Sequence, residues 1–396
     1  MRVADRMNRI PASQTMAITM KAMEMKARGI DVIGFGAGEP DFDTPKNIKD
    51  AAIRAIEEGF TKYTQVGGIP ELKKAVCEKF RHDNGLEYTP DNIVVSAGGK
   101  HSLYNLFHVL FQKGDEVIIP APYWVSYPPI AILAEATPVI PPTNEEGSFK
   151  LTPGALEEAI TPRTRGLVIN SPCNPTGAAY TRSEMENLME AVLKHPDIWV
   201  ISDDIYEKIV YDGLEFVNPA NIGEEAKART IVLNGVSKSY AMTGWRIGYA
   251  AAPKEIAAAM SKLQGQNTGN PCSIAQKAAV EALAGSQDSV EAMRREFQKR
   301  RDYIVNAFNQ IPGVSCFNPQ GAFYVFPNIS SLLGREIRGK TLSNSTAFSE
   351  FMLEEARVAL VAGEAFGAEN YIRLSYATSM ENIQEGMRRI RKALEA

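Results

Sequence analysis

Lys238 and Arg246 lie eight residues apart in a segment that follows an apolar run at 230–233. A lysine amine can bond to the carbonyl carbon of an aldehyde, and an arginine guanidinium can hold a phosphate through two parallel hydrogen bonds. The pair is therefore suited to a phosphate-bearing aldehyde, with the lysine at the carbonyl carbon and the arginine at the phosphate. Taken alone, a lysine and an arginine this close together are more often a solvated surface pair.

Asp203 is the candidate for a second part of the same chemistry. The aldehyde that suits the pair is pyridoxal 5′-phosphate, whose protonated ring nitrogen withdraws charge from a substrate carbanion and needs a carboxylate beside it. Asp203 follows the apolar run 198–202, so it lies at the carboxyl end of a predicted buried parallel strand, where sites of open α/β sheets form. An aspartate in such a place is as often a helix N-cap.

Asn174 takes a similar position after the apolar run 166–169. It lies in the sequence Asn-Ser-Pro-Cys-Asn-Pro-Thr-Gly at 170–177, whose prolines and glycine cannot continue a strand and predict a turn. By itself, this segment is only a turn.

In this order and spacing, the segments resemble the fold-type I pyridoxal phosphate enzymes, specifically the class I aminotransferases. The resemblance covers nearly the whole chain through further motifs at 36–42, 62–63, 66–68, 96–100, 122–124, 203–206, 244–249 and 372–376. Within the family the chain is most similar to bacterial aspartate aminotransferases of the branch with Gly-Gly-Lys before the first helix of the large domain. One departure is Asp204, which stands where the family usually has glutamate. Because the ring-nitrogen aspartate of the family maps to Asp203, we expect no effect on the chemistry.

The composition is that of an ordinary globular protein. The 396 residues exceed one compact core, and 44% hydrophobic and 23% charged residues are typical values. A formal net charge of -4 offers no basic surface for nucleic acid. Residues 1–30 contain no signal-peptide core and no apolar run could span a bilayer, so we expect a cytoplasmic enzyme without membrane contact. The four cysteines and four histidines show no ligand spacing, so we expect neither a metal site nor structural disulfides.

Strand and helix signals alternate through most of the chain and predict an α/β fold, with a mainly parallel seven-stranded sheet flanked by helices on both faces. The strand-like runs are 92–96, 115–119, 137–140, 166–170, 198–202, 230–234 and 247–251, and helical patterns between them include 69–83, 98–112, 181–194 and 253–264. From 286 to 310 a charged helical pattern leads to short strands at 323–326 and 372–375 and a helix at 380–394, which predicts a smaller α+β domain.

These patterns divide the chain into a large cofactor-binding domain at 46–285 and a small C-terminal domain at 286–396. By resemblance, the N-terminal segment 1–45 packs with the small domain. The polar stretch 335–340 is the one segment that reads as a linker.

Phosphate binding is expected at Gly98 and Gly99, which follow a predicted strand and open a helix, where backbone amides and the positive helix end suit an anion. A glycine pair at a helix start is by itself commonly just a tight turn. The resemblance implies that Ser237 and Arg246 complete this site and that Trp124 stacks on the cofactor ring.

The resemblance also implies the catalytic roles. Lys238 carries the cofactor and then acts as the general base that moves a proton from the substrate Cα, while Asp203 keeps the ring nitrogen protonated. Tyr206 and Asn174 are implied to hydrogen-bond the phenolic oxygen of the cofactor.

Substrate binding is implied for Arg373, whose planar guanidinium would hold the α-carboxylate bidentately, with Gly38, Trp124 and Asn174 close by. In an unknown protein, such an arginine is better read as an edge-strand residue paired with a surface acid. The surrounding Ile-Arg-Leu-Ser-Tyr motif at 372–376 favours the carboxylate role.

Recognition of aspartate or glutamate needs a second cation. No arginine occurs between Lys262 and Arg294, the region from which other branches of the family supply one. In the resembled branch the lysine after Gly-Gly can face the distal carboxylate, so Lys100 is the candidate, helped by hydroxyls of Ser13 and Thr15. A merely solvated lysine is disfavoured there, because a cation at a helix N-terminus opposes the dipole.

We therefore expect a transaminase that moves the amino group of L-aspartate or glutamate to a 2-oxo acid such as 2-oxoglutarate by a ping-pong mechanism. Tyr63 resembles the tyrosine that reaches the cofactor phosphate of the neighbouring subunit, which implies a homodimer with shared sites. The alternatives are an aminotransferase for prephenate, aromatic or neutral amino acids, or another reaction of the same scaffold, such as a β-lyase. An effector-binding module of a regulator is disfavoured, because the enzyme motifs begin within the first 40 residues.

Overall fold

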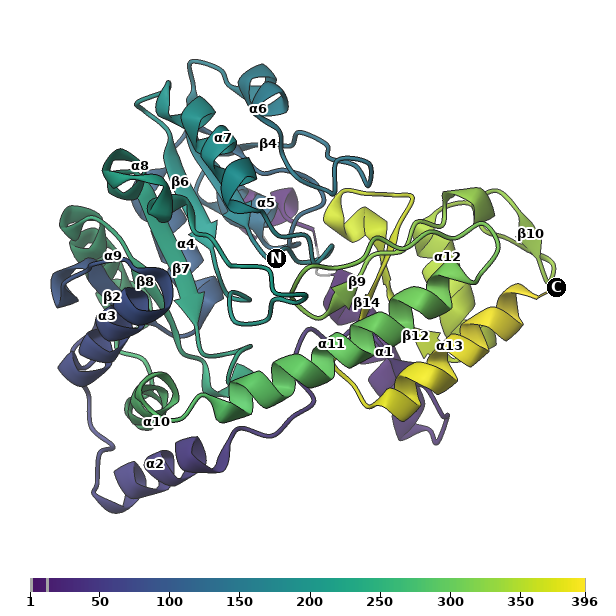
Figure 1. Cartoon of the computed structure of the whole chain (residues 1–396), viewed down its shortest axis with the longest axis horizontal. Coiled ribbons are helices and arrows are strands. Elements are labelled where there is room, and N and C mark those ends of the chain that lie inside the picture. Colours follow the sequence, from purple (N-terminus) through teal and green to yellow (C-terminus); the bar gives the residue numbers. More distant parts are fainter. Residues whose placement is uncertain (1–2, 12–13, 396) are drawn as a thin grey trace.

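The computed structural model describes residues 3–11 and 14–395, which form two lobes (Figure 1). The large lobe is built on a seven-stranded sheet in the order β2-β8-β7-β6-β5-β3-β4. Its strands are β2 (Ile93–Ser96), β3 (Glu116–Ile118), β4 (Thr137–Val139), β5 (Thr164–Asn170), β6 (Trp199–Asp203), β7 (Thr230–Gly235) and β8 (Gly248–Ala251). β8 runs antiparallel to both of its neighbours, β2 and β7, and the other pairs of this sheet are parallel. The predicted α/β fold with a mainly parallel sheet is confirmed.

Helices cover both faces of this sheet (Figure 1). The helices of the large lobe are α2 (Lys46–Glu57), α3 (Pro70–Asn84), α4 (Gly99–Leu110), α5 (Tyr127–Leu133), α6 (Pro153–Ala159), α7 (Arg182–Leu193), α8 (Glu224–Ala228), α9 (Lys254–Asn267) and α10 (Ser273–Ala284), of which α2 packs on α10. Successive side chains of a strand point to opposite faces. In β7, Ile231 and Leu233 accordingly join the core with α4 and α9, whereas Val232 joins the core with α3 and α10. Apolar side chains on both faces explain why these strands read as continuous apolar runs.

The small lobe is built on a three-stranded antiparallel sheet in the order β13-β14-β9. Its strands are β9 (Tyr324–Val325), β13 (Val361–Ala362) and β14 (Ile372–Ser375), and its helices are α11 (Asp288–Asn309), α12 (Ser345–Phe351), the π-helical turn Met352–Ala356 and α13 (Met380–Leu394). The long helix α11 runs from the large lobe into the small one (Figure 1).

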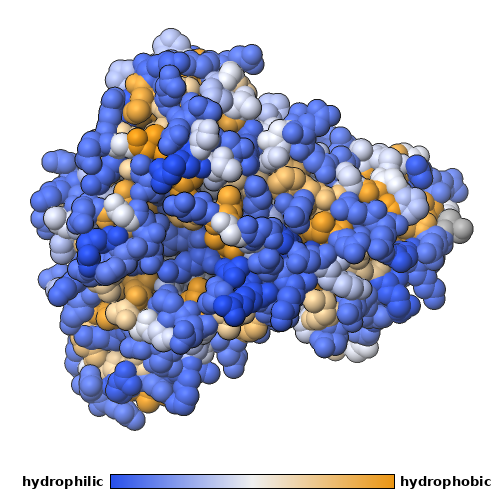
Figure 2. Space-filling view, in the orientation of Figure 1, coloured by the Kyte–Doolittle hydropathy of each residue, from blue (hydrophilic) through white to orange (hydrophobic). Residues whose placement is uncertain are grey.

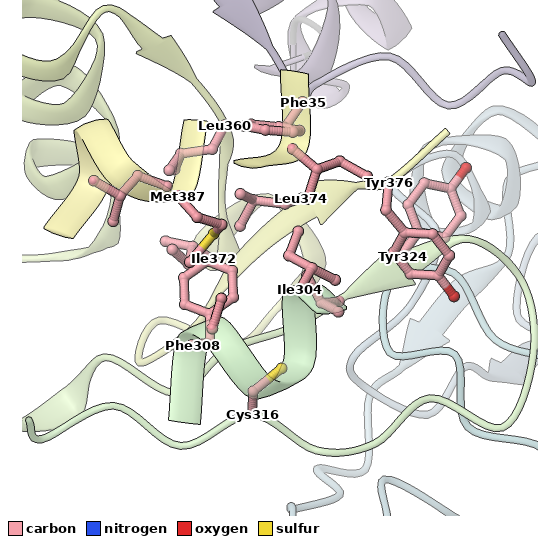
Figure 3. Packing of buried hydrophobic residues seen from close by; sticks show 14 of the residues in the cluster. Phe35, Ile304, Phe308, Cys316, Tyr324, Leu360, Ile372, Leu374, Tyr376 and Met387 are labelled. Carbon is pink, nitrogen blue, oxygen red and sulfur yellow. The ribbon is translucent and has the colours of Figure 1, made fainter. Parts of the chain in front are cut away.

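The N-terminal segment contributes to the small lobe. After α1 (Gln14–Ala27), the short strand β1 (Ile33–Gly34) pairs in parallel with β12 (Val358–Ala359). Phe35 is fully buried in the core between the small sheet and helices α11 and α13 (Figure 3). It packs so closely on α13 that a Cβ at Gly386 would lie 2.4 Å from its ring.

The polar stretch 335–340 is not a linker, so that prediction is wrong. It forms most of a hairpin of two short antiparallel strands, β10 (Glu336–Ile337) and β11 (Lys340–Thr341). Ile337 is buried in the small-lobe core and holds the hairpin in place. Its strands have only two residues each, too few for the alternation of apolar and polar residues that predicts a strand.

The molecular surface is mainly hydrophilic on the face shown in Figure 2, with small separate apolar areas. Within the described parts of the chain, no helix has both the length and the apolar character needed to cross a membrane.

Candidate active site

The carboxyl ends of β5 and β6 bring two predicted site residues together. In the sheet register, Asn170 at the end of β5 lies beside Asp203 at the end of β6. Asn170 donates from Nδ2 to the backbone oxygen of Asp203 (2.9 Å) and accepts from the backbone N–H of Asn174 (2.8 Å). The turn with Asn174 is thereby fixed to the strand that carries Asp203.

The Asp203 carboxylate is desolvated, and the aromatic residues Tyr127 and Trp124 pack beside it. Tyr127 donates its hydroxyl to Oδ2 of Asp203 (2.6 Å), and the Trp124 ring packs edge-on against Tyr127 with centroids 5.3 Å apart. Burial raises the pKa of Asp203, while the Tyr127 hydrogen bond and the charge of Lys238 act in the opposite direction. A positive charge beside this carboxylate would therefore be strongly stabilised.

Lys238 lies in the turn that follows β7, and its Nζ donates to the backbone oxygen of Gly38. Burial lowers the pKa of Lys238 to about 8; the positive charges of Arg246 and Arg373 add to this, and the carboxylate of Glu39 opposes it. A lysine with a lowered pKa exposes a larger share of neutral amine near neutral pH. Neutral amine is the form that acts as a nucleophile or a base.

An anion site lies where α4 begins. Gly98 caps α4 with a positive φ of 96°, and a Cβ there would meet Nη2 of Arg246 at 2.5 Å. Arg246 also has a positive φ, 56°, and donates from Nη1 to the backbone oxygen of Thr243 (2.9 Å). Ser237 is buried just before Lys238. The structure thus places a guanidinium against the positive end of a twelve-residue helix, an arrangement that suits a phosphate.

Arg373 occupies the central strand of the small sheet and is only 3% exposed. It donates from Nη1 to Oδ1 of Asn174 (3.0 Å) and from Nη2 to the backbone oxygen of Gly36 (2.7 Å). Among the described residues, no acidic side chain forms an ion pair with Arg373 and no acceptor meets its buried Nε. Burial accordingly lowers the pKa of this guanidinium. The reading of an edge-strand arginine paired with a surface acid does not apply.

Comparison with known proteins identifies the family. The family model described as Aminotransferase class I and II matches residues 30–390. This chain belongs to the class I and II aminotransferases.

Similar members of the family are known from several bacteria. This class I and II aminotransferase is 54% identical to the aspartate/prephenate aminotransferase of Cereibacter sphaeroides over 389 residues, which cover 98% of this chain and 97% of that protein. It is 51% identical to the aspartate aminotransferase of Geobacillus stearothermophilus, with 100% of each chain covered. The resemblance predicted from the motifs is confirmed, and the chain is a transaminase.

Solved structures of the family have the same fold. The aspartate aminotransferase from Rhizobium meliloti matches with a TM-score of 0.97 at 47% identity, covering 100% of this chain and 99% of that one. The aspartate aminotransferase from Thermus thermophilus with maleate matches with a TM-score of 0.93 at 42% identity, covering 100% of each chain.

Class I and II aminotransferases depend on pyridoxal phosphate, and the described residues of this one fit that cofactor. The close approach of Arg246 to Gly98 forms a cationic cradle that any Cβ at Gly98 would fill. The desolvated Asp203 would be stabilised by a protonated ring nitrogen, and Lys238 has the lowered pKa that suits bonding to an aldehyde carbon.

The predicted distal cation also lies near this site of the aminotransferase. Lys100, in the first turn of α4, places Nζ 5.0 Å from the centroid of the Trp124 ring. Desolvation lowers the pKa of Lys100, and the charge of Arg246 adds to this effect. A cation under such repulsion gains from the approach of an anion.

The structure does not join three further predicted residues to this group. Tyr63 is 98% exposed in the irregular segment between α2 and α3, so it is not the half-buried strand aromatic that its sequence surroundings would otherwise suggest. Ser13 lies outside the described residues, and Thr15 is described only as part of α1.

Sequence reasoning missed Tyr127, Asn170 and Tyr324. Tyr127 reaches Asp203 over 76 positions and Tyr324 reaches Tyr206 over 118, so no local spacing could reveal either contact. A signal existed for Asn170, because it ends the apolar run of β5 just as Asp203 ends that of β6.

Asp204 points away from these residues into a buried polar network. Its carboxyl group accepts hydrogen bonds from Ser202 (2.6 Å) and from Asn218. Burial raises the pKa of Asp204 to about 8, and the neighbouring Glu207 contributes. Neither of these partners is a predicted site residue, and the expectation that the departure at position 204 leaves the chemistry unchanged stays a prediction.

Proposed function

We propose that the enzyme transfers the amino group of L-aspartate or L-glutamate to a 2-oxo acid such as 2-oxoglutarate through pyridoxal phosphate, in two half-reactions of ping-pong type. The observation that carries this proposal is the buried Arg373, which has no acidic partner among the residues that the structure describes, together with Lys100 as a second cation nearby. One cation suits an α-carboxylate, and two suit a dicarboxylate. The names of the relatives and the maleate, itself a dicarboxylate, in the Thermus thermophilus structure support the same choice.

In this proposal Arg373 binds the substrate α-carboxylate with its guanidinium fork and orients the amine toward Lys238. When bound, pyridoxal phosphate supplies the electron sink that stabilises negative charge at the substrate Cα. Lys238, as a neutral amine, would accept the Cα proton of the substrate at Nζ. Asp203 would hold the proton of the cofactor's ring nitrogen in place.

The remaining residues of the proposal hold the cofactor. Gly98, Gly99, Ser237 and Arg246 would bind the phosphate. Trp124 would stack on the ring, and Tyr206 and Asn174 would donate to the phenolic oxygen. Gly38 fixes the resting position of Lys238 through its backbone oxygen. Ser13 and Thr15 remain candidates for additional contacts to the distal carboxylate.

The direct test of the reaction is to mix the enzyme with aspartate and 2-oxoglutarate and to measure oxaloacetate and glutamate. Equal amounts of the two products are expected, because each turn of the cycle makes one of each. Release of pyruvate or ammonia from a single amino acid would instead indicate a β-lyase. Prephenate is a second candidate acceptor, because the relative that is 54% identical bears the name aspartate/prephenate aminotransferase.

Replacing Lys100 with alanine is expected to lower kcat/KM for aspartate and glutamate. The expected loss of transition-state stabilisation is about 2–5 kcal/mol, the range for removing one partner of a desolvated charge pair. Alanine as substrate should be much less affected, because it offers no distal charge. Steady-state kinetics with the three amino acids measure the difference.

Lys113→Ala is the matched control, since it removes an exposed lysine beyond the other end of α4. It should leave all three values unchanged. Equal losses for aspartate and alanine in Lys100→Ala would assign Lys100 to cofactor binding or folding and would remove the main support for dicarboxylate specificity.

We further propose a homodimer in which Tyr63 reaches the cofactor phosphate of the partner subunit. Its support is the almost complete exposure of a tyrosine side chain, together with the exposed Ile53 and Ile56 on the neighbouring α2. Such apolar exposure is typical of a surface that another chain covers.

Mixing Tyr63→Phe chains with Lys238→Ala chains should restore activity to part of the mixture. In a heterodimer of shared sites, one site would contain both altered residues and the other site neither. The measurement is turnover after subunit exchange, with heterodimers verified by mass. Activity no higher than that of the two impaired parents would rule out a role of Tyr63 across the interface.

A cytoplasmic location and the division of the chain at 1–45, 46–285 and 286–396 complete the proposal. The pairing of β1 with β12 supports grouping the first segment with the last, and limited proteolysis with mapping of the fragments tests the boundaries.

A further inference from the structure

Tyr324 brings a hydroxyl from the small lobe to the hydroxyl of Tyr206 in the large lobe. The two oxygens lie 2.8 Å apart, and the rings meet edge-on at 85° with centroids 5.8 Å apart. Tyr206 lies in the turn after β6, whereas Tyr324 belongs to β9. Both side chains are buried, with 3% and 1% exposure, so this contact excludes water as an alternative partner.

The Tyr324 side chain also touches two other residues of the site. A Cβ at Gly38 would lie 2.7 Å from the Tyr324 hydroxyl, so this close approach requires glycine at position 38. The guanidinium of Arg373 lies over the Tyr324 ring, 4.6 Å from its centroid. Tyr324 therefore packs between the backbone that holds Lys238 and the proposed carboxylate-binding arginine.

The direction of the hydrogen bond follows from counting protons. Each tyrosine hydroxyl has one proton to donate and accepts through its oxygen. Burial raises the pKa of both Tyr206 and Tyr324, so both hydroxyls keep their protons at neutral pH. If Tyr206 donates to the phenolic oxygen of the cofactor, its proton is used and its oxygen remains an acceptor. Tyr324 is then the donor.

We propose that Tyr324 is a positioning residue that donates its hydroxyl proton to Oη of Tyr206 and thereby keeps the Tyr206 proton directed at the phenolic oxygen of the cofactor. This inference rests on the proposed function. A donor to Oη polarises the Tyr206 hydroxyl and strengthens its own donation, as in other chains of hydrogen bonds. Because the two hydroxyls belong to different lobes, the relay exists only while the small lobe is seated against the large one.

A double-mutant cycle with Tyr324→Phe and Tyr206→Phe tests the inference. One readout is the dissociation constant for pyridoxal phosphate, and the other is the midpoint pH of the absorption change of the holoenzyme. Losing a donor to the phenolic oxygen makes that oxygen hold its proton more tightly, so both single variants should raise the midpoint pH. The expected rise for Tyr324→Phe is roughly 0.3–1 pH unit, smaller than for Tyr206→Phe, because it acts one bond further away.

In the Tyr206→Phe background, Tyr324→Phe should cause no further shift, because the residue through which it acts is gone. A shift of the same size in both backgrounds would overturn the inference, and so would a wild-type midpoint in Tyr324→Phe.

Tyr376→Phe is the matched control. Tyr376 is equally buried in the small lobe, but its hydroxyl bonds to Tyr211 and to the backbone oxygen of Ala322 (both 3.2 Å). Figure 3 shows that the hydroxyls of Tyr324 and Tyr376 point in different directions. Tyr376→Phe should keep the wild-type midpoint pH. A shift equal to that of Tyr324→Phe would show that the shift comes from lost packing and would contradict the inference.

The proposed function and the inference fail in different ways. If the wild-type chain takes up no pyridoxal phosphate, the proposed function is wrong. If the chain takes up the cofactor but Tyr324→Phe keeps the wild-type midpoint pH, only the inference is wrong.

Discussion

Replacing Lys238 with alanine is expected to lower the turnover of aspartate and 2-oxoglutarate by several orders of magnitude. The substitution removes one amine that has two roles, since Lys238 both bonds to the cofactor and moves the Cα proton. The loss of turnover therefore includes the loss of both roles. After treatment with borohydride, mass spectrometry should find a covalent pyridoxyl group on the wild-type chain and none on the variant.

Lys238→Arg separates charge from reactivity. It keeps a cation near Asp203 but offers no neutral amine, because arginine stays protonated. We expect it to be as inactive as the alanine variant. Turnover near the wild-type value in either variant would show that Lys238 is not the catalytic amine.

Replacing Arg373 with alanine is expected to lower kcat/KM for every amino acid, because the α-carboxylate is common to all of them. The expected loss of transition-state stabilisation is about 2–5 kcal/mol. Aspartate, glutamate and alanine should lose similar factors, in contrast to the selective loss expected for Lys100→Ala. Parallel kinetics on the three substrates provide the measurement.

Arg373→Lys is the companion variant. Lysine supplies the charge but not the planar fork with which Arg373 contacts Asn174 and Gly36 through two separate nitrogens. Partial recovery is expected, with the deficit mainly in KM. The melting temperature of Arg373→Ala is the control for folding. A value far below that of the wild-type protein would show that this variant loses activity through unfolding. A loss confined to the two dicarboxylic amino acids would contradict the α-carboxylate role.

The main sheet could be predicted from the sequence because most of its strands are buried on both faces, the edge strand β4 being the exception. All seven predicted runs correspond to β2 through β8 with ends that differ by at most two residues. The same burial places Asp203 at a strand end, because the apolar run stops where the chain leaves the sheet. The short strands of the hairpin at 336–341 bury little and therefore gave no such signal.

The contacts within the site could be predicted only in part. Motif resemblance pointed to Lys238, Asn174 and Arg373 as members of one site, and a hydrogen bond connects Arg373 with Asn174. The hydroxyls of Tyr127 and Tyr324 could not be assigned from the sequence, because each meets its partner only through the packing of distant segments. In the sequence, Tyr127 resembles an ordinary apolar residue of a helix, and Tyr324 resembles an ordinary apolar residue of a strand.

The pairing of β1 with β12 has a consequence for the synthesis of the chain. Ile33 and Phe35 leave the ribosome long before their partners in β12 and α13 are made. All seven strands of the main sheet are complete by Ala251, so that sheet can form while the ribosome is still working. The small lobe can close only after β12 and α13 have been made, and until then the apolar residues of its N-terminal segment lack their partners. A nascent chain stalled before Val358 would therefore be prone to aggregate even though its large sheet had already folded.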